Sequence, residues 1–200
     1  MYRLIDVNAI QKVVMRGLSV PTAINLGDYL YMCAIRALTT GAGDPERRIR
    51  ALDVLNDAVG RMIGGQWADI GFESRDDVGV DEYLDMSAGK TGALLGAPME
   101  MGALLAGAST GDAALAGRWG QRIGLAFQAC DDYLGIWGDP TLTGKSNASD
   151  LKRRKKSLAI VFGLNSAEAG TVLRQAFAAP GEIGDTTVLV EALEAAGADR

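Results

Sequence analysis

The sequence predicts an all-α fold, a bundle of helices joined by short connections. Apolar residues recur at spacings of three and four along most of the 200-residue chain, and β-branched runs with a period of two are scarce. Residues typical of helix ends, such as Asp44-Pro45-Glu46 and Gly138-Asp139-Pro140, separate these stretches. The length is that of one domain, so we expect residues 1–200 to form a single helical unit.

The first half of the chain predicts three long helices. Apolar residues spaced by three and four give residues 20–38 the apolar face of a helix. A second helix is expected over residues 45–72, because proline at residue 45 fits the first helical position. Asp81-Glu82 supplies the negative charge that a helix N-terminus favours, which predicts a third helix over residues 81–106.

The second half predicts four more helices and one loop. The helices are expected over residues 113–137, 150–164, 167–177 and 187–196, and the loop over residues 141–149. Gly138-Asp139-Pro140 ends the first of these helices, and Ala179-Pro180-Gly181 separates the last two. The helix over residues 150–164 would have a basic first half and an apolar second half.

Glycine is abundant inside the predicted helices. The chain has 26 glycines in 200 residues, whereas a typical protein has about 7% glycine. Several, including Gly89, Gly92, Gly96 and Gly102, interrupt helical patterns, where each costs up to about 1 kcal/mol relative to alanine. We interpret them as positions where helices approach closely, with kinks or room for a ligand between helices as alternatives.

Composition limits the partners of the chain. The net charge of −5 argues against general nucleic-acid binding. Cys33 and Cys130 lie inside apolar helical patterns, so we expect buried, reduced thiols and a cytoplasmic protein. The N-terminal residues contain no signal-peptide core. The most apolar stretch, residues 91–108, includes Pro98 and Glu100, which favours a buried core helix over a membrane span.

The most informative stretch for chemistry is residues 127–158. Gln128, Asp131 and Asp132 lie three and four residues apart, so they share one face of a helix. Asp139 follows near the helix end, and Lys145 lies in the next loop. Carboxylate oxygens beside ammonium groups suit Mg²⁺ bound to a polyphosphate. The alternative is a solvated acidic face, which the apolar flanks of the pair disfavour.

Two other helices carry candidate polar groups. Lys90-Thr91 lies in the glycine-rich helix, either as a cation facing an internal cavity or as a lysine whose stem lies along apolar surface. Gln66 and Asp69 lie one turn apart and would line the same cavity or form a polar helix edge. The absence of histidine excludes imidazole-based catalysis and imidazole metal sites. The cations of residues 152–156 indicate phosphate attraction or an exposed helix face.

These motifs occur together in one order, which resembles that of the trans-isoprenyl diphosphate synthases (polyprenyl synthetases). The order is G-Q-W-A-D, Y-L-D-M-S-A-G-K-T-G, F-Q-A-C-D-D-Y-L-G-I-W-G-D, T-G-K and D-L-K-R-R-K-K-S-L. The resemblance covers nearly the whole chain. It implies a class I isoprenoid synthase bundle, in which helices surround a central cavity and two aspartate-rich motifs hold Mg²⁺.

The resemblance also implies an activity and a set of site residues. The reaction would be Mg²⁺-assisted ionisation of an allylic diphosphate, followed by condensation with isopentenyl diphosphate. Asp131 and Asp132 would bind Mg²⁺, Lys90 and Lys145 would contact the diphosphate, and Thr91 and Gln128 would lie beside the reacting carbon. Gln66 is expected to line the substrate cavity. The product is the only expected link to membranes, and the expected assembly is a homodimer or a heterodimer with a related synthase.

The sequence departs from the family pattern in two places. The last aspartate of the second motif is replaced by Gly135, and Asp139 is the candidate to substitute as a metal ligand. No first aspartate-rich motif precedes Val20, so we expect the chain to lack that N-terminal part and some of the C-terminus. Two alternatives to the transferase therefore stay open, a terpene cyclase of the same fold and a non-catalytic subunit that pairs with a complete synthase.

Overall fold

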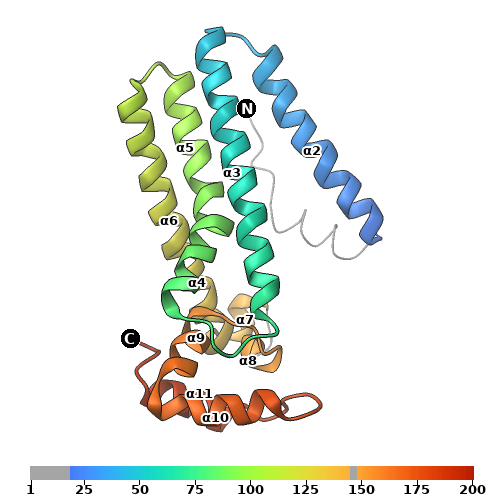
Figure 1. The fold of residues 1–200 in the computed structure, drawn as a ribbon, viewed down its shortest axis with the longest axis vertical. Helices are drawn as coiled ribbons and strands as arrows, with labels where there is room; N and C mark the ends of the chain where they lie inside the picture. The colour runs from blue at the N-terminus through green and yellow to red at the C-terminus, as the bar shows by residue number, and fades with distance from the viewer. Residues whose placement is uncertain (1–18, 145–147) are drawn as a thin grey trace.

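The computed structural model describes residues 19–144 and 148–200 and shows a helical bundle in two parts (Figure 1). Long helices stand side by side in the upper part, and short helices lie beneath them. No strand occurs in the described residues, which confirms the predicted all-α class. The helical segments up to α6 are α2 (Val20–Thr40), α3 (Pro45–Phe72), α4 (Val80–Ser87), η1 (Ala88–Gly92), α5 (Ala93–Leu105) and α6 (Thr110–Trp137). Those after α6 are α7 (Pro140–Thr143), α8 (Ser149–Lys152), α9 (Leu158–Asn165), α10 (Ala167–Ala178) and α11 (Thr187–Ala195).

Helix boundaries follow the polar caps in the sequence. The Asp44 carboxylate accepts a hydrogen bond from the Glu46 N–H at 2.9 Å, and Pro45 opens α3 as expected. Helix α6 begins at Thr110, earlier than the expected residue 113, because the Ser109 hydroxyl accepts from the Asp112 N–H at 3.1 Å. Gly138 ends α6 as expected. The first residues of the expected loop form α7, which Asp139 caps.

Two predicted helices are interrupted. The helix expected over residues 81–106 is α4, η1 and α5 in succession, and η1 has π geometry. The basic helix expected over residues 150–164 is wrong, because α8 ends at Lys152 and α9 begins only at Leu158. Arg154 has a φ of 52° and is followed by a hydrogen bond from the Lys155 N–H to the Asp150 carbonyl at 3.0 Å. This is a Schellman ending, which reverses the chain direction within the basic run.

The largest hydrophobic core lies in the lower part of the molecule, where α6 meets the short helices. It consists of Ile136, Ala148, Leu151, Ala159, Ile160, Leu164, Ala169, Leu173, Phe177, Leu189 and Leu193. A second cluster joins the end of α3 to α4 and α9, through Phe72, Val78, Tyr83, Met86 and Val161. Burial of these side chains fixes α9 between the long helices and the C-terminal helices.

Small residues let the helices of the upper part pack closely, as predicted from the glycines inside the helical patterns. A Cβ added to Gly96 would lie 2.9 Å from the Gly117 carbonyl oxygen, so α5 and α6 are in direct backbone contact. Gly89 and Gly92 also face neighbouring backbone. A Cβ added to Gly89 would lie 3.0 Å from the Arg61 carbonyl oxygen, and one added to Gly92 would lie 3.4 Å from the Gln121 carbonyl oxygen. Gly102 differs, since nothing lies within 4 Å of its added Cβ. Close packing therefore explains three of these four glycines.

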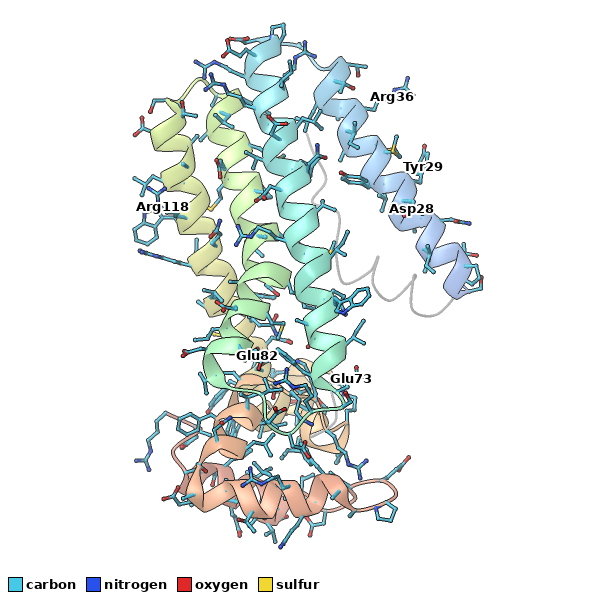
Figure 2. All side chains as sticks on the ribbon, in the orientation of Figure 1. Asp28, Tyr29, Arg36, Glu73, Glu82 and Arg118 are labelled. Atoms are coloured by element: carbon cyan, nitrogen blue, oxygen red, sulfur yellow. The ribbon has the colours of Figure 1, made fainter. Side chains whose placement is uncertain are left out.

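Helix α2 leans away from the rest of the bundle (Figure 1). Ile24, Tyr29, Leu30 and Met32 are each more than half exposed on it, and Figure 2 shows Tyr29 pointing away from α3. The expected burial of both cysteines is wrong, because Cys33 and Cys130 are exposed, although both are free thiols. Among the described residues, no helix combines the length and the apolar character that crossing a bilayer requires.

The contact between α3 and η1 gives a testable prediction. A Cβ on Gly65 would lie 2.7 Å from the Met86 carbonyl oxygen and 2.9 Å from Lys90 Cα. Gly65→Ala should therefore destabilise the fold by about 1–3 kcal/mol, because backbone atoms must shift. A Cβ added to its neighbour Gly64 would have no atom within 4 Å, so Gly64→Ala should be neutral or stabilising by up to about 1 kcal/mol. Urea unfolding measures both, and equal effects would contradict the close-contact explanation.

Candidate active site

The buried carboxylate of Asp132 lies at the centre of the candidate site. Its side chain is on α6 and is only 1% exposed. Oδ1 accepts from Gln128 Nε2 at 3.0 Å and from Lys155 Nζ at 2.9 Å. Oδ2 accepts from the Leu158 N–H at 2.8 Å and from the Tyr83 hydroxyl. Four donors fill the hydrogen-bonding capacity of a carboxylate, which is how a buried charge of this kind is stabilised.

The groups around Asp132 have shifted proton affinities. Burial and the nearby negative charge of Asp132 raise the pKa of the Tyr83 hydroxyl, so it stays protonated and donates. Burial lowers the pKa of the Lys155 ammonium, but the charges of Asp132 and Asp150 raise it by more. The net pKa of Lys155 is above its ordinary value, and the side chain therefore remains a cation.

The π-helical segment η1 presents two of the predicted residues on successive positions. Lys90 Nζ donates to Asp69 Oδ2 on α3 at 2.5 Å, and Thr91 Oγ1 donates to Gln128 Oε1 on α6 at 2.8 Å. A π turn changes the direction of side chains relative to an α-helix and is frequent at functional sites. Here it allows adjacent residues to reach two different helices.

Glycines bring those helices close enough for these contacts. Gly124 lies one turn before Gln128, and a Cβ on it would be 2.8 Å from Gly92 Cα. Gly65 lies one turn before Asp69 and faces the backbone of η1 in the same way. Each close backbone contact therefore precedes, by one helical turn, a polar side chain that bonds to η1.

The basic run of residues 152–156 divides its cations among several partners. Arg153 Nη2 donates to Asp150 at 2.9 Å, and Arg154 Nη2 donates to the carbonyls of residues 179 and 181. Lys156 is 4% exposed, forms an ion pair with Asp76 at 3.0 Å and lies over the Phe177 ring. Lys155 points instead toward Asp132 and Asp150. The run is therefore a structural turn that places one lysine in the site.

An open cleft of about 590 Å³ lies between the end of α3, α6 and this turn. Its lining residues combine acids of α3 and α6 with cations of the basic turn: Asp69, Glu73, Asp131, Arg153, Arg154, Lys155 and Lys156. Figure 2 shows Glu73 at the lower end of α3, above the short helices. Carboxylates for a cation and cations for an anion thus line one cleft, which suits a metal–diphosphate pair.

The other predicted residues lie at the edge of this arrangement or beyond it. Asp139 caps α7, where its Oδ1 accepts from the Thr141 N–H and hydroxyl, and these bonds hold the pKa of its carboxyl below the usual range. Gln66 is half-buried beside Gly65 and makes no hydrogen bond to the other candidates in the described part of the chain. Lys145 lies outside the described residues.

The cleft offers carboxylates to a cation such as Mg²⁺ without a complete set of protein ligands among the described residues. Among the described residues, no three acidic, histidine or cysteine side chains converge as a complete metal site. Mg²⁺ commonly takes one or two carboxylates and completes its shell with water and phosphate oxygens. The cleft fits that pattern, because Asp131 offers a carboxylate and the nearby cations would bind the phosphate.

Three residues of the site were not among the predicted site residues: Tyr83, Asp150 and Lys155. Tyr83 and Lys155 reach Asp132 from distant positions of the chain, and Asp150 pairs with Lys155, which follows it by five residues. Signals for two of them were present, since Asp150 opens the D-L-K-R-R-K-K-S-L motif and Lys155 belongs to the run of cations for which phosphate attraction was expected. Nothing local distinguished Tyr83 from the other aromatic residues of the predicted helices.

Comparison with known proteins places the chain in a family. The family described as polyprenyl synthetase matches residues 10–193. The chain belongs to the polyprenyl synthetase family. A relative, geranylgeranyl diphosphate synthase of Mycobacterium tuberculosis, is 45% identical over 162 residues, which are 80% of this chain and 46% of the relative.

Two solved structures of the polyprenyl synthetase fold are also similar. The polyprenyl synthetase of Streptomyces coelicolor A3(2) aligns with a TM-score of 0.80 and 38% identity, over 90% of this chain and 55% of that one. A geranylgeranyl pyrophosphate synthase of Corynebacterium glutamicum, complexed with isoprenyl diphosphate and magnesium, aligns with a TM-score of 0.77 and 31% identity, over 90% and 52%. The chain thus spans about half the length of these relatives.

The Tyr83–Asp132 contact gives the prediction for this site. Tyr83→Phe removes a donor from a buried charge and should lower the free energy of unfolding by about 1–3 kcal/mol. Tyr133→Phe on the exposed side of α6 is the matched control, with an expected change within about 0.5 kcal/mol. Guanidinium unfolding monitored by circular dichroism measures both, and a Tyr83 variant as stable as the control would argue against the bond.

Proposed function

We propose that this polyprenyl synthetase chain acts in the Mg²⁺-dependent condensation of an allylic diphosphate with isopentenyl diphosphate. The observation that carries the proposal is the cleft, where Asp131 and Asp69 face the turn that carries Lys155. Its charge distribution matches a diphosphate with a bound divalent cation. The relatives named above are synthases of the same family, which supports the same reaction class.

The two adjacent aspartates have different proposed roles. Asp131 lines the cleft and is the proposed Mg²⁺ ligand, with Asp139 as a further proposed ligand near the helix end. The metal, when bound, supplies positive charge that offsets the charge of the leaving diphosphate. Asp132 was expected to share in metal binding, but its four hydrogen bonds favour a positioning role. Its Oδ1 accepts from both Gln128 and Lys155, so one carboxylate oxygen fixes these two side chains relative to each other.

The remaining polar groups would contact either the phosphate oxygens or the reacting carbon of the allylic diphosphate. Lys90 and Lys155 would bind its phosphate oxygens and stabilise the charge that develops there as the C–O bond breaks. The Thr91 hydroxyl donates a hydrogen bond to Gln128 Oε1. The remaining lone pairs of Thr91 Oγ1 and Gln128 Oε1 would therefore be available to stabilise the cationic carbon. Lys145 is proposed as another diphosphate contact and Gln66 as a residue of the substrate cavity.

An apolar stripe on α6 leads to the proposed metal ligand. Trp119, Ile123 and Phe127 are each at least half exposed and lie four residues apart, and Asp131 is the next residue in this series. A prenyl chain whose diphosphate lies at Asp131 would follow this stripe. The same apolar character would exclude water from the reacting carbon.

Assembly and location are further parts of the proposal. The exposed apolar side chains of α2, including Tyr29 and Met32, are the proposed dimer contact with a second copy or a related synthase. Free thiols at Cys33 and Cys130 support a reducing compartment, and we propose the cytoplasm. The prenyl product is the only proposed link to a membrane, and no nucleic-acid partner is proposed.

Calorimetric titration with farnesyl diphosphate tests the metal site. We expect binding in the presence of Mg²⁺ and none in EDTA, with turnover on addition of isopentenyl diphosphate. Asp131→Ala should abolish the Mg²⁺-dependent binding, because it removes the cleft carboxylate on α6. Asp57→Ala, an exposed acid on α3, is the control and should bind like the unmodified chain. Equal affinity in both variants would remove the metal-site proposal.

A second pair of variants tests the proposed role of the basic turn. Lys155→Gln should weaken farnesyl diphosphate binding about tenfold or more, since a hydrogen bond to a charged group contributes about 1.5–3 kcal/mol. Lys152→Gln removes an exposed cation three residues earlier and should have little effect. If both variants lose affinity equally, the run attracts diphosphate through general charge, and Lys155 has no special place.

A further inference from the structure

The carboxylate of Asp150 occupies the space where a side chain at residue 135 would lie. Gly135 is on α6, one turn beyond Asp131 and Asp132. A Cβ added to Gly135 would lie 2.6 Å from Cγ and 3.0 Å from Oδ1 of Asp150. No side chain fits at this position of α6 while Asp150 keeps its place.

Asp150 is buried, and its partners among the described residues belong to the basic turn and to its own helix. The residue is 1% exposed. Its Oδ1 accepts from Arg153 Nη2 at 2.9 Å and lies 3.5 Å from the Ser149 hydroxyl, and its Oδ2 lies 3.4 Å from Lys155 Nζ. A buried carboxylate is stable only with such partners, so its position and that of the cations depend on each other.

Two buried carboxylates therefore flank Lys155. Asp132 on α6 lies 2.9 Å from its ammonium group, and Asp150 on α8 lies 3.4 Å from it. A flexible lysine held at two points has fewer accessible positions than one held at a single point. Both Lys155 and Arg153 line the cleft proposed for the diphosphate.

We propose that Asp150 is a positioning residue for diphosphate binding and that Gly135 is required because it leaves room for the Asp150 carboxylate. The second aspartate-rich motif of this chain has glycine where the pattern has its last aspartate. Asp150 returns a carboxylate to that place from a different helix. This inference rests on the proposed function, since the anion that Lys155 and Arg153 bind is the proposed diphosphate.

The first experiment measures binding of inorganic pyrophosphate with Mg²⁺ by calorimetry. Asp150→Asn keeps the shape of the side chain and removes its charge. We expect affinity to fall about 10- to 100-fold, as is typical when a partner of a binding residue is lost. The assay runs at a temperature where circular dichroism shows every variant folded. Glu46→Gln removes an equal charge at the far end of the bundle and should bind like the unmodified chain.

The second experiment exchanges the carboxylate between the two positions. Gly135→Asp alone should weaken pyrophosphate binding, because the added side chain displaces Asp150. Asp150→Gly alone should weaken it through loss of the carboxylate. The double variant Gly135→Asp, Asp150→Gly should recover most of the affinity, since the carboxylate then comes from α6. The double variant Gly135→Ala, Asp150→Gly is the control for steric relief, because it removes the clash without restoring a carboxylate and should not recover the affinity.

The outcomes separate this inference from the proposed function. Tight Mg²⁺-dependent binding by both the unmodified chain and Asp150→Asn would overturn the role of Asp150 and leave the proposed function standing. A double variant weaker than both single variants would overturn the exchange of carboxylates. An unmodified chain that does not bind pyrophosphate with Mg²⁺ would overturn the proposed function itself, and the role of Asp150 with it.

Discussion

The buried carboxylate of Asp132 connects the parts of this molecule that the backbone leaves far apart. Its donors come from α4, from α6, from the basic turn and from the first residue of α9. An unpaired charge at 1% exposure would cost several kcal/mol, so each of these donors contributes to the stability of the fold. The same requirement fixes Gln128 and Lys155 relative to each other, which ties the stability of the fold to the geometry of the site.

Glycine contributes to this geometry through contact rather than flexibility. Gly65 and Gly124 let α3 and α6 reach the backbone of η1, and one turn later Asp69 and Gln128 bond to its side chains. A larger residue at either position would separate the helices and lengthen both polar contacts. The cost of glycine in a helix is thus offset by an arrangement of side chains that alanine would not permit.

The basic run shows how one short segment can serve both structure and chemistry. Arg154 adopts a left-handed conformation and donates to the loop after α10, while Lys156 is buried against Asp76 and Phe177. These anchors on both sides leave Lys155 pointing toward Asp132. The two lysines are adjacent and chemically identical, so their different surroundings alone decide which one can meet an anion.

The sequence by itself determined the all-α class, most helix boundaries and the polyprenyl synthetase motifs, because periodicity, caps and motif order are local properties. It also selected Thr91 and Gln128, which form a hydrogen bond in the structure. Only the tertiary structure decided that η1 is a π segment, that α8 ends in a left-handed turn and that both cysteines are exposed. It alone brought Tyr83 to Asp132 and Asp150 against Gly135, since these contacts depend on how helices distant in sequence approach one another, which no local pattern records.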